Sequence, residues 1–347
     1  MSVPEALTAP AQQVDARLRV ALEGFRRDWT RVDPMLGETI DLLERLLLAG
    51  GKRIRPAMAY WGFVAAGGAP DDPRIADLGA GLELLQAFAL FHDDVMDGSL
   101  TRRGMPTAHV REVERHTSAG WRGEARRYGE AVAILAGDVA LVMSDVLLSD
   151  IGPGVRSLWN ELRIEVNLGQ FLDVVGTARG EVGLETAERI VDYKTARYTI
   201  VRPLQMGSAL AGGEHLIGTL AEVGTPLGMA FQLRDDLLGA FGEPDLTGKP
   251  VGDDLREGKP TPLLARARAL ATPDQVEVLA LVGSDVDDQA VRRIQATLTA
   301  TGAVEEIEHQ IAHLTETRLE RLRESSLSGN AAQQLSIIAR YLAARRH

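Results

Sequence analysis

Two groups of aspartates lie at the ends of strongly apolar stretches. The first is Asp93-Asp94-Val95-Met96-Asp97, and the second is Asp235-Asp236. Asp93 and Asp97 are four residues apart, so in a helix both carboxylates project from one face. The two like charges repel each other, and the C-terminal end of the helix dipole disfavours both. We therefore expect a cation here, and Mg²⁺ is the hard ion that carboxylates bind together with phosphates.

Basic residues accompany both aspartate groups. The sequence places them at Lys52, Arg53 and Arg55 in Gly-Gly-Lys-Arg-Ile-Arg-Pro, at Arg102 and Arg103 after the first group, and at Lys249 and Lys259 after the second. One basic residue alone would be read as ordinary surface charge. Together they indicate two diphosphate sites, one held mainly through metal and one mainly through Arg and Lys.

The elements that must position these residues are helices. Apolar residues recur at helical spacing almost from end to end, and Gly and Pro mark the breaks. The pattern predicts helices at 12–31, 36–49, 55–67, 73–97, 124–150, 154–177, 184–212, 215–240, 256–270, 287–300, 303–324 and 329–346. We predict an all-α protein with one domain over 1–347 and two long loops, Gly98 to Arg122 and Phe241 to Thr261.

Composition narrows the possible classes. The 347 residues are 45% hydrophobic and 25% charged, which is ordinary for a globular chain, and they include no cysteine, so disulfides and zinc-thiolate sites are excluded. A net charge of −11 argues against a nucleic-acid surface. The apolar stretch from Leu78 to Phe91 contains Glu83 and is shorter than the ~20 residues of a membrane span, so we predict a buried core helix. The N-terminus has no secretory pattern, and a cytoplasmic location is expected.

With these motifs in place, the chain resembles the head-to-tail trans-isoprenyl diphosphate synthases of the polyprenyl synthetase family. The matching landmarks occur in the family's order: Gly-Gly-Lys-Arg-Ile-Arg-Pro, Gln86, the DDxxD of Asp93 to Asp97, Arg102-Arg103-Gly104, Gly137-Asp138, Gly169-Gln170, Lys194-Thr195, Phe231-Gln232-Leu233-Arg234-Asp235-Asp236 and the two Gly-Lys segments. An ordered set of this kind is far more specific than one DDxxD.

The resemblance implies a fold and a metal site. The fold would be the isoprenoid synthase fold, with antiparallel helices around a central cavity. Asp93, Asp97 and Asp235 would coordinate three Mg²⁺ ions that bridge the allylic diphosphate, while Asp94 and Asp236 would act in the outer shell.

The resemblance also assigns the substrate contacts. Arg102, Lys194 and Lys249 would hold the allylic diphosphate, with Lys259 nearby, and Lys52, Arg55, Arg103 and Gln86 would hold isopentenyl diphosphate. The allylic diphosphate would ionise, the isopentenyl double bond would attack, and a proton would leave to the released diphosphate. Thr195 and Gln232, with carbonyls freed by a helix kink at Pro203, would stabilise positive charge near the reacting carbons.

Product length is expected to depend on the residues before the first motif. Ala89 lies four residues before Asp93 and Phe88 five, each about one helical turn away. Leu85 lies eight residues before Asp93, about two turns away. Within the family, one aromatic at the fifth position resembles geranylgeranyl diphosphate synthases. We therefore expect a twenty-carbon product from dimethylallyl, geranyl or farnesyl diphosphate, with farnesyl diphosphate or a longer product as the alternative.

One departure from the family pattern and two rival functions remain open. The second motif is commonly DDxxD, but its fifth position here is Gly239, which leaves the number and affinity of bound metals uncertain. A terpene cyclase would share the first motif, and Asp285-Val286-Asp287-Asp288 spells a DxDD, which we interpret as an acidic loop before a helix. A noncatalytic regulatory subunit should have lost an aspartate motif. We expect an active homodimer.

Overall fold

The computed structural model describes residues 3–102, 104–180, 182–242, 252–324 and 327–344. These residues are almost entirely helical, which confirms the predicted all-α class. Packing of the backbone separates two compact units: an N-terminal unit of Glu5–Tyr60 and Ala69–Gly152, and a C-terminal unit of Met1–Pro4, Trp61–Gly68 and Pro153–His347. The assignment of one domain to 1–347 stays a prediction.

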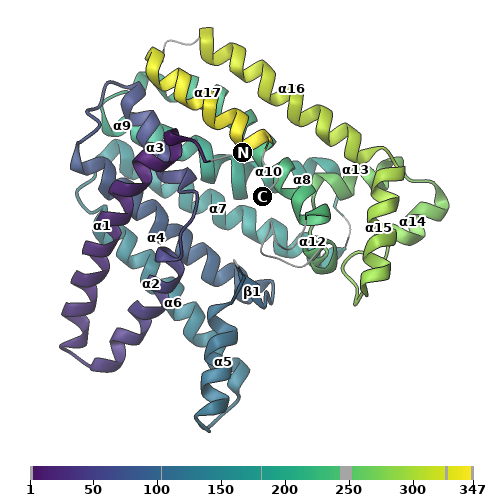
Figure 1. Ribbon diagram of the computed structural model, residues 1–347, viewed down its shortest axis with the longest axis horizontal. Coiled ribbons are helices and arrows are strands. Elements are labelled where there is room, and N and C mark those ends of the chain that lie inside the picture. The colour runs from purple at the N-terminus through teal and green to yellow at the C-terminus, as the bar shows by residue number, and fades with distance from the viewer. Residues whose placement is uncertain (1–2, 103, 181, 243–251, 325–326, 345–347) are drawn as a thin grey trace. The chain divides into compact units, whose positions relative to one another are not determined.

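The N-terminal unit is organised around one central helix. Its elements are α1 (Glu5–Thr30), η1 (Pro34–Leu36), α2 (Gly37–Leu48), the start of α3 (Ile54–Ala65), α4 (Pro73–Met96), β1 (Thr101–Arg102), β2 (Met105–Pro106), α5 (Ala108–Ser118) and α6 (Ala125–Leu147). Helix α4 packs against α1, α2 and α6, and α5 packs against α6. Figure 1 labels the helices α1 to α6 and the strand β1.

Helix α4 begins and is buried as its sequence dictates. Asp72 caps the N-terminus by accepting a hydrogen bond from the backbone N–H of Arg74, and Pro73 fits the first turn, where its missing N–H costs nothing. The helix is long and apolar enough to cross a membrane, but 67% of its most apolar window is buried within the protein. That burial is what the core-helix prediction requires.

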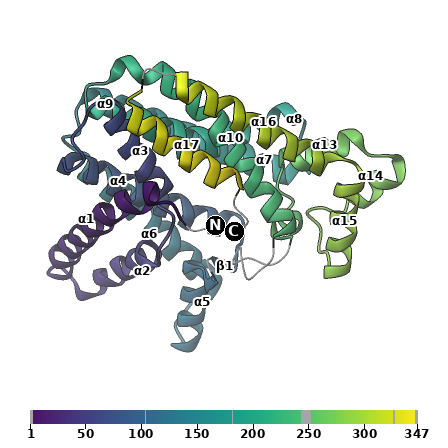
Figure 2. The same cartoon turned by 45° about the horizontal axis from the view of Figure 1, so that its top comes forward.

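The C-terminal unit contains the second long apolar helix. Its elements are α7 (Pro153–Arg179), α8 (Leu184–Val191), η2 (Asp192–Val201), α9 (Arg202–Leu210), η3 (Glu214–Leu216), α10 (Ile217–Phe241), α12 (Asp253–Glu257), α13 (Pro262–Leu270), α14 (Pro273–Leu279), α15 (Asp288–Ala300), α16 (Ala303–Glu324) and α17 (Gly329–Ala344). Helix α10 packs against η2, α16 and α17, and Figure 2 shows α16 and α17 running beside it.

The predicted helix at 184–212 is three segments. Its middle part, η2, is a ten-residue π-helix that ends just before Pro203 in the first turn of α9. A proline cannot donate the helical hydrogen bond and crowds the preceding turn. A wider π-turn accommodates this break, and such turns are frequent at functional sites. Lys194 and Thr195 lie in this segment.

The structure corrects three further parts of the predicted secondary structure. The predicted loop from Gly98 to Arg122 contains the β1–β2 hairpin and helix α5, and the predicted helix at 256–270 is split into α12 and α13 at Gly258, whose φ is +74°. Helix α5 was missed because its buried residues, Glu112 and His116, are polar and give no apolar period. Helix α14 was also missed, since seven residues carry little periodic signal.

Candidate active site

The first aspartate motif forms the C-terminal end of α4. The backbone N–H of Asp97 donates to the carbonyl of Asp93 at 2.8 Å, so the last turn is helical and both side chains lie on one face. Asp93 and Asp97 are partly exposed, whereas Asp94 is buried. The motif therefore has two partly exposed aspartates and one buried aspartate.

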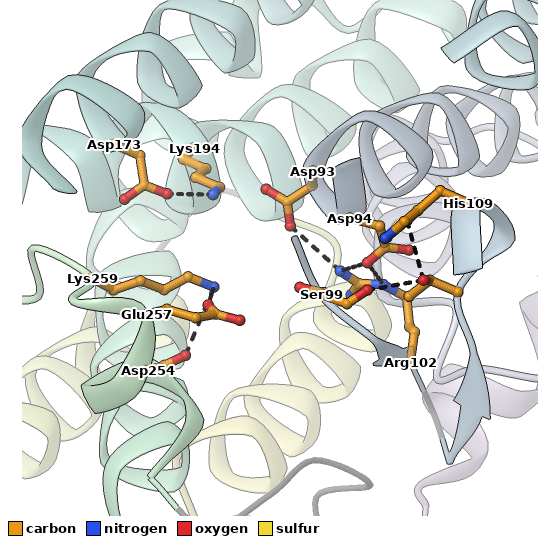
Figure 3. Close-up of polar contacts among 11 residues, drawn as sticks. Asp93, Asp94, Ser99, Arg102, His109, Asp173, Lys194, Asp254, Glu257 and Lys259 are labelled. Carbon is orange, nitrogen blue, oxygen red and sulfur yellow. Dashed lines mark hydrogen bonds and ion pairs between the residues drawn. The ribbon is translucent and has the colours of Figure 1, made fainter. Parts of the chain in front are cut away.

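The β1–β2 hairpin places Arg102 against this motif. Its Nε donates to Asp94 Oδ1 at 2.7 Å, and its Nη2 lies 3.4 Å from Asp93 Oδ2 (Figure 3). Gly104, at φ +73°, supplies the turn. Burial raises the pKa of Asp94, and the guanidinium of Arg102 limits that rise. Arg103 lies outside the described residues.

Side-chain hydrogen bonds anchor the chain between α4 and α5. Thr107 Oγ1 donates to the carbonyl of Ser99 at 2.9 Å and lies 3.2 Å from Nδ1 of His109 (Figure 3). Burial lowers the pKa of His109. These contacts hold both ends of the hairpin that carries Arg102.

The predicted chain-length residues lie in the buried part of α4. Leu85 is fully buried, Phe88 is 8% exposed and Ala89 is partly buried. The ring of Phe88 lies 4.7 Å from the ring of His92, centroid to centroid. A Cβ added at Gly137 of α6 would come within 2.4 Å of His92, which accounts for a glycine at this landmark.

The basic segment between α2 and α3 alternates in exposure. Lys52 and Arg55 are partly exposed, while Arg53 between them is buried. Gln86 is partly buried in α4, seven residues and about two turns before Asp93. Sequence reasoning did not separate Arg53 from its two neighbours.

In the C-terminal unit, a hydrogen-bonded chain links η2 to the second aspartate motif. Thr195 Oγ1 donates to Gln232 Oε1 at 2.6 Å, and Gln232 Nε2 donates to Asp236 Oδ1 at 2.7 Å. Asp235, the neighbouring residue on α10, is exposed. The structure thus brings together three of the predicted residues, Thr195, Gln232 and Asp236, and it buries Asp236 while leaving Asp235 exposed.

Two further carboxylates, those of Asp173 and Asp254, lie near Asp235 and Asp236 and form an acidic cluster with them. The sequence analysis predicted neither. Burial raises the pKa of Asp236 well above its usual value, and the nearby charges of Asp254, Asp235 and Asp173 add to the rise. Oδ2 of Asp236 is buried and has no hydrogen-bond partner among the described residues. An orphaned carboxylate oxygen in an acidic cluster fits a site that binds a cation.

Two lysines neutralise part of this charge. Lys194 Nζ donates to Asp173 Oδ2, and Lys259 Nζ lies 2.7 Å from Glu257 Oε2 and 3.8 Å from Asp254 Oδ1 (Figure 3). Sequence reasoning also missed Glu257. The other predicted lysine, Lys249, lies outside the described residues.

Glycines explain why these elements come so close. A Cβ added at Gly169 of α7 would lie 2.7 Å from the backbone N of Lys194, and one at Gly228 of α10 would lie 2.4 Å from Cα of Ala196. Real Cβ atoms do not approach so near, so both glycines permit the packing of η2 between its neighbours. At Gly239 the added Cβ would lie 1.7 Å from Asp254 Oδ2. The carboxylate of Asp254 therefore occupies the space that a third aspartate of DDxxD would enter.

The donor chemistry fits a hard divalent ion that also binds its substrate. Among the described residues, no three His, Asp or Glu side chains lie close enough to hold a metal by themselves. Mg²⁺ commonly takes only one or two protein carboxylates and completes its shell with waters and phosphates. Isolated carboxylates beside basic residues match that mode of binding.

The DxDD segment has the structural role predicted for it. Asp287 caps α15 by accepting from the backbone N–H of Ala290 at 2.8 Å, and Asp288 binds Arg256 at 2.6 Å. Asp285 is exposed. This is an acidic turn before a helix.

Comparisons with known proteins agree with the helical architecture and the motifs. The chain is 30% identical over 311 residues to geranylfarnesyl diphosphate synthase of Aeropyrum pernix, covering 86% of this chain and 92% of that protein. It is 31% identical to geranylgeranyl diphosphate synthase of Saccharolobus solfataricus, covering 67% and 68%.

A solved structure is also similar throughout. The geranylgeranyl pyrophosphate synthase of Corynebacterium glutamicum, complexed with isoprenyl diphosphate and magnesium, superposes with a TM-score of 0.93 at 38% identity and covers 100% of both chains. The sequence model of the polyprenyl synthetases matches residues 38–299. Together with the two aspartate motifs, these matches establish that the chain belongs to the polyprenyl synthetase family.

Proposed function

We propose that the protein is a head-to-tail prenyltransferase that condenses isopentenyl diphosphate with dimethylallyl, geranyl or farnesyl diphosphate and releases geranylgeranyl diphosphate. One observation carries the proposal: each long apolar helix ends in aspartates with a basic side chain held close by. Arg102 lies against Asp93 at the end of α4, and Lys194 binds Asp173 in the cluster around Asp236.

Three carboxylates are assigned to the metal. Asp93, Asp97 and Asp235 would bind three Mg²⁺ ions, and their partial exposure supports this assignment. Asp94 and Asp236 are buried and bonded to Arg102 and Gln232, which supports an outer-shell role for each. When bound, Mg²⁺ would neutralise the charge that develops on the departing diphosphate.

The basic residues hold the two substrates during the reaction, and the released diphosphate accepts the proton. Arg102, Lys194, Lys249 and Lys259 hold the allylic diphosphate while its C–O bond breaks and an allylic cation forms. The double bond of isopentenyl diphosphate, held by Lys52, Arg55, Arg103 and Gln86, attacks that cation and forms a C–C bond. The adduct then loses a proton to the released diphosphate, so no side-chain base is needed.

Thr195 and Gln232 would act on the positive charge. Their hydrogen bonds to each other and to Asp236 fix the direction of both polar groups. Fixed dipoles stabilise developing charge without reorganising during the reaction. We place them near the reacting carbons, together with the backbone carbonyls of the π-helix η2.

The protein is proposed to act as a cytoplasmic homodimer without nucleic acid and without a membrane span. The net charge of −11 and the burial of α4 support the last two points. Each unit also exposes a row of apolar residues on one long helix, Leu135, Val142 and Val146 on α6 and Ile164, Leu168 and Phe171 on α7.

The test is direct product analysis. Purified protein is incubated with Mg²⁺, labelled isopentenyl diphosphate and each of the three allylic primers, and the dephosphorylated products are resolved by chain length. A twenty-carbon linear alcohol that disappears when a chelator is added is the expected result. A product of another length would keep the reaction and reject the assigned specificity.

Matched variants connect the activity to the motifs. Asp93→Asn and Asp235→Asn should each lower turnover by about a hundredfold or more, because each removes a charge that balances the metal. Asp28→Asn removes an exposed aspartate of α1 and should leave turnover unchanged. A cyclic hydrocarbon, or no turnover with any primer, would contradict the proposed function.

A further inference from the structure

Arg53 has a backbone conformation that is rare for its residue type. Its φ is +46°, and no other non-glycine residue in the described ranges has a positive φ. Gly50 and Gly51, which precede it, have φ of +88° and +159°. A left-handed conformation is unfavourable for an L-residue other than glycine, so other contacts must compensate for it at Arg53.

The side chain of Arg53 supplies those contacts. It is only 5% exposed, and its guanidinium donates to three acceptors on three helices. Nε and Nη2 bind Asp15 Oδ1 of α1 at 3.0 and 2.8 Å, Nη2 also donates to the carbonyl of Leu47 in the last turn of α2, and Nη1 donates to Glu83 of α4. Glu83 is itself 6% exposed.

The type of side chain matters here. Arg presents several N–H groups in a rigid planar fork, so one side chain can bind three separate acceptors, while Lys presents a single ammonium on a flexible stem. A buried charge whose partner is removed is strongly unfavourable. Arg53 and Glu83 therefore depend on each other for their place in the core.

The consequence for the site follows from the neighbours in sequence. Lys52 and Arg55, on either side, are partly exposed and carry the basic groups assigned to isopentenyl diphosphate. Glu83 lies three residues before Gln86, so the two side chains are neighbours on the same side of α4. The ion pair between Arg53 and Glu83 thus fastens the basic segment to the turn of α4 that carries Gln86.

We propose that Arg53 is a positioning residue, whose buried contacts with Asp15, Leu47 and Glu83 fix Lys52 and Arg55 for binding the diphosphate of the homoallylic substrate. This proposal rests on the proposed function. Arg53 itself does not touch the substrate. Its left-handed backbone turns its side chain into the core while its neighbours stay accessible.

The experiment separates the side chain from the backbone. Arg53→Gly removes the guanidinium and also relieves the unfavourable φ, Arg53→Lys keeps the charge but loses the fork, and Glu83→Gln keeps the shape but removes the charge. Arg17→Ala is the matched control, since Arg17 Nε also joins α1 to α4, by binding Asp77 at 2.5 Å, without contacting the basic segment. Steady-state kinetics with each substrate varied, binding of isopentenyl diphosphate by calorimetry, and melting temperature are measured on every variant.

Arg53→Gly should raise KM and Kd for isopentenyl diphosphate by about tenfold or more while KM for the allylic primer changes by less than about twofold. Arg53→Lys and Glu83→Gln should give smaller changes in the same direction, and Arg17→Ala should change neither constant. If Arg53→Gly does not fold, the two milder variants decide.

Two results would overturn the positioning role. One is an unchanged Kd for isopentenyl diphosphate in the Arg53 and Glu83 variants. The other is an equal rise of both KM values in proportion to the fall in melting temperature, which Arg17→Ala would share. A wild-type protein that neither binds isopentenyl diphosphate nor forms product would instead reject the proposed function, and the positioning role with it.

Discussion

Phe88 is the bulkiest of the three residues that precede Asp93 on the predicted channel side. Its ring is buried against His92. Replacing it by Ala would open space on α4 more than one turn before Asp93, so Phe88→Ala should shift the product distribution to chains at least one isoprene unit longer. Ala89→Phe should shift it to shorter chains, because the added ring lies one turn below Asp93. Product chromatography with farnesyl diphosphate as primer checks both.

Each of these two variants is a control for the other, because one should lengthen the product and the other should shorten it. A large-to-small change in a core costs about 3–5 kcal/mol and could loosen the protein, but loosening would not shorten the product of Ala89→Phe. Products of unchanged length from both variants would contradict the assignment of Phe88 and Ala89.

The carboxylate of Asp254 lies against Gly239, the fifth position of the second aspartate motif. Since an added Cβ at 239 would lie 1.7 Å from Asp254 Oδ2, Gly239→Asp must displace that carboxylate. We expect Gly239→Asp and Asp254→Asn each to weaken divalent metal binding by about tenfold to a hundredfold, as changes next to metal ligands do. Manganese titration followed by electron paramagnetic resonance measures this without turnover.

The double variant Gly239→Asp with Asp254→Gly tests the reciprocity of the two positions. If Asp254 takes over the space and charge of the missing aspartate, moving the carboxylate back to 239 should recover part of the metal affinity. Full affinity in Gly239→Asp alone would show that the two positions are independent.

Glu165 of α7 joins that helix to both the π-helix η2 and α9. Glu165 accepts from Nη1 of Arg197 at 2.8 Å and from Nε and Nη2 of Arg202 at 2.8 and 2.7 Å. Burial alone would raise the pKa of Glu165, but the two guanidinium groups outweigh it and the pKa is lowered. The ionised carboxylate therefore stabilises the fold.

Glu165→Gln should reduce the free energy of unfolding by about 1–3 kcal/mol at pH 7. A carboxylate with a lowered folded-state pKa stabilises the protein above its unfolded value near 4.5, and the effect disappears as pH falls through the folded value. The melting-temperature gap between wild type and variant should thus shrink below pH 4.5. Glu161→Gln, which removes an exposed partner of Arg202, is the control and should cost less. A gap that does not change with pH would contradict this role.

Periodicity predicted the long helices because their packing follows the apolar pattern. α4 and α10 were found to within a residue or two, since each is a long and almost continuously apolar stretch. The method failed where burial is polar or conformation is set by single residues. Helix α5 buries Glu112 and His116, and the π-turn of η2 depends on packing around Pro203, neither of which gives a period.

Across the full chain, some residues of the candidate site were predicted from the sequence and others were missed. The landmark residues, such as Asp93 and Gln232, were predicted because local motifs carry them. The sequence analysis missed Asp173, Asp254 and the pair of Arg53 and Glu83. Their roles arise from contacts between distant parts of the chain, and the two residues of the pair are 30 positions apart. A single sequence therefore reveals functional residues that lie in short motifs, but it does not reveal residues that act through tertiary contacts.

Helix α6 exposes apolar side chains that offer a surface for self-association. Leu135, Val142 and Val146 are spaced seven and four residues apart on α6, so they lie along one face of that helix, and each is more than half exposed. A row of exposed apolar side chains on a long helix is typical of a protein-protein interface. The proposed occupant is the same row on a second copy of the chain.

Val142→Glu should therefore convert the dimer to a monomer, because the interface would bury an unpaired charge, which costs several kcal/mol. Val20→Glu is the matched control: Val20, on α1, is 63% exposed against 62% for Val142, so the same change there should leave a dimer. Light scattering coupled to size exclusion, repeated over a range of micromolar concentrations, gives the mass of each. A wild type that is monomeric throughout, or a Val142→Glu variant that remains a dimer, would contradict the interface on α6. Equal melting temperatures for the two variants at high dilution would confirm that only association, and not the fold of the single chain, separates them.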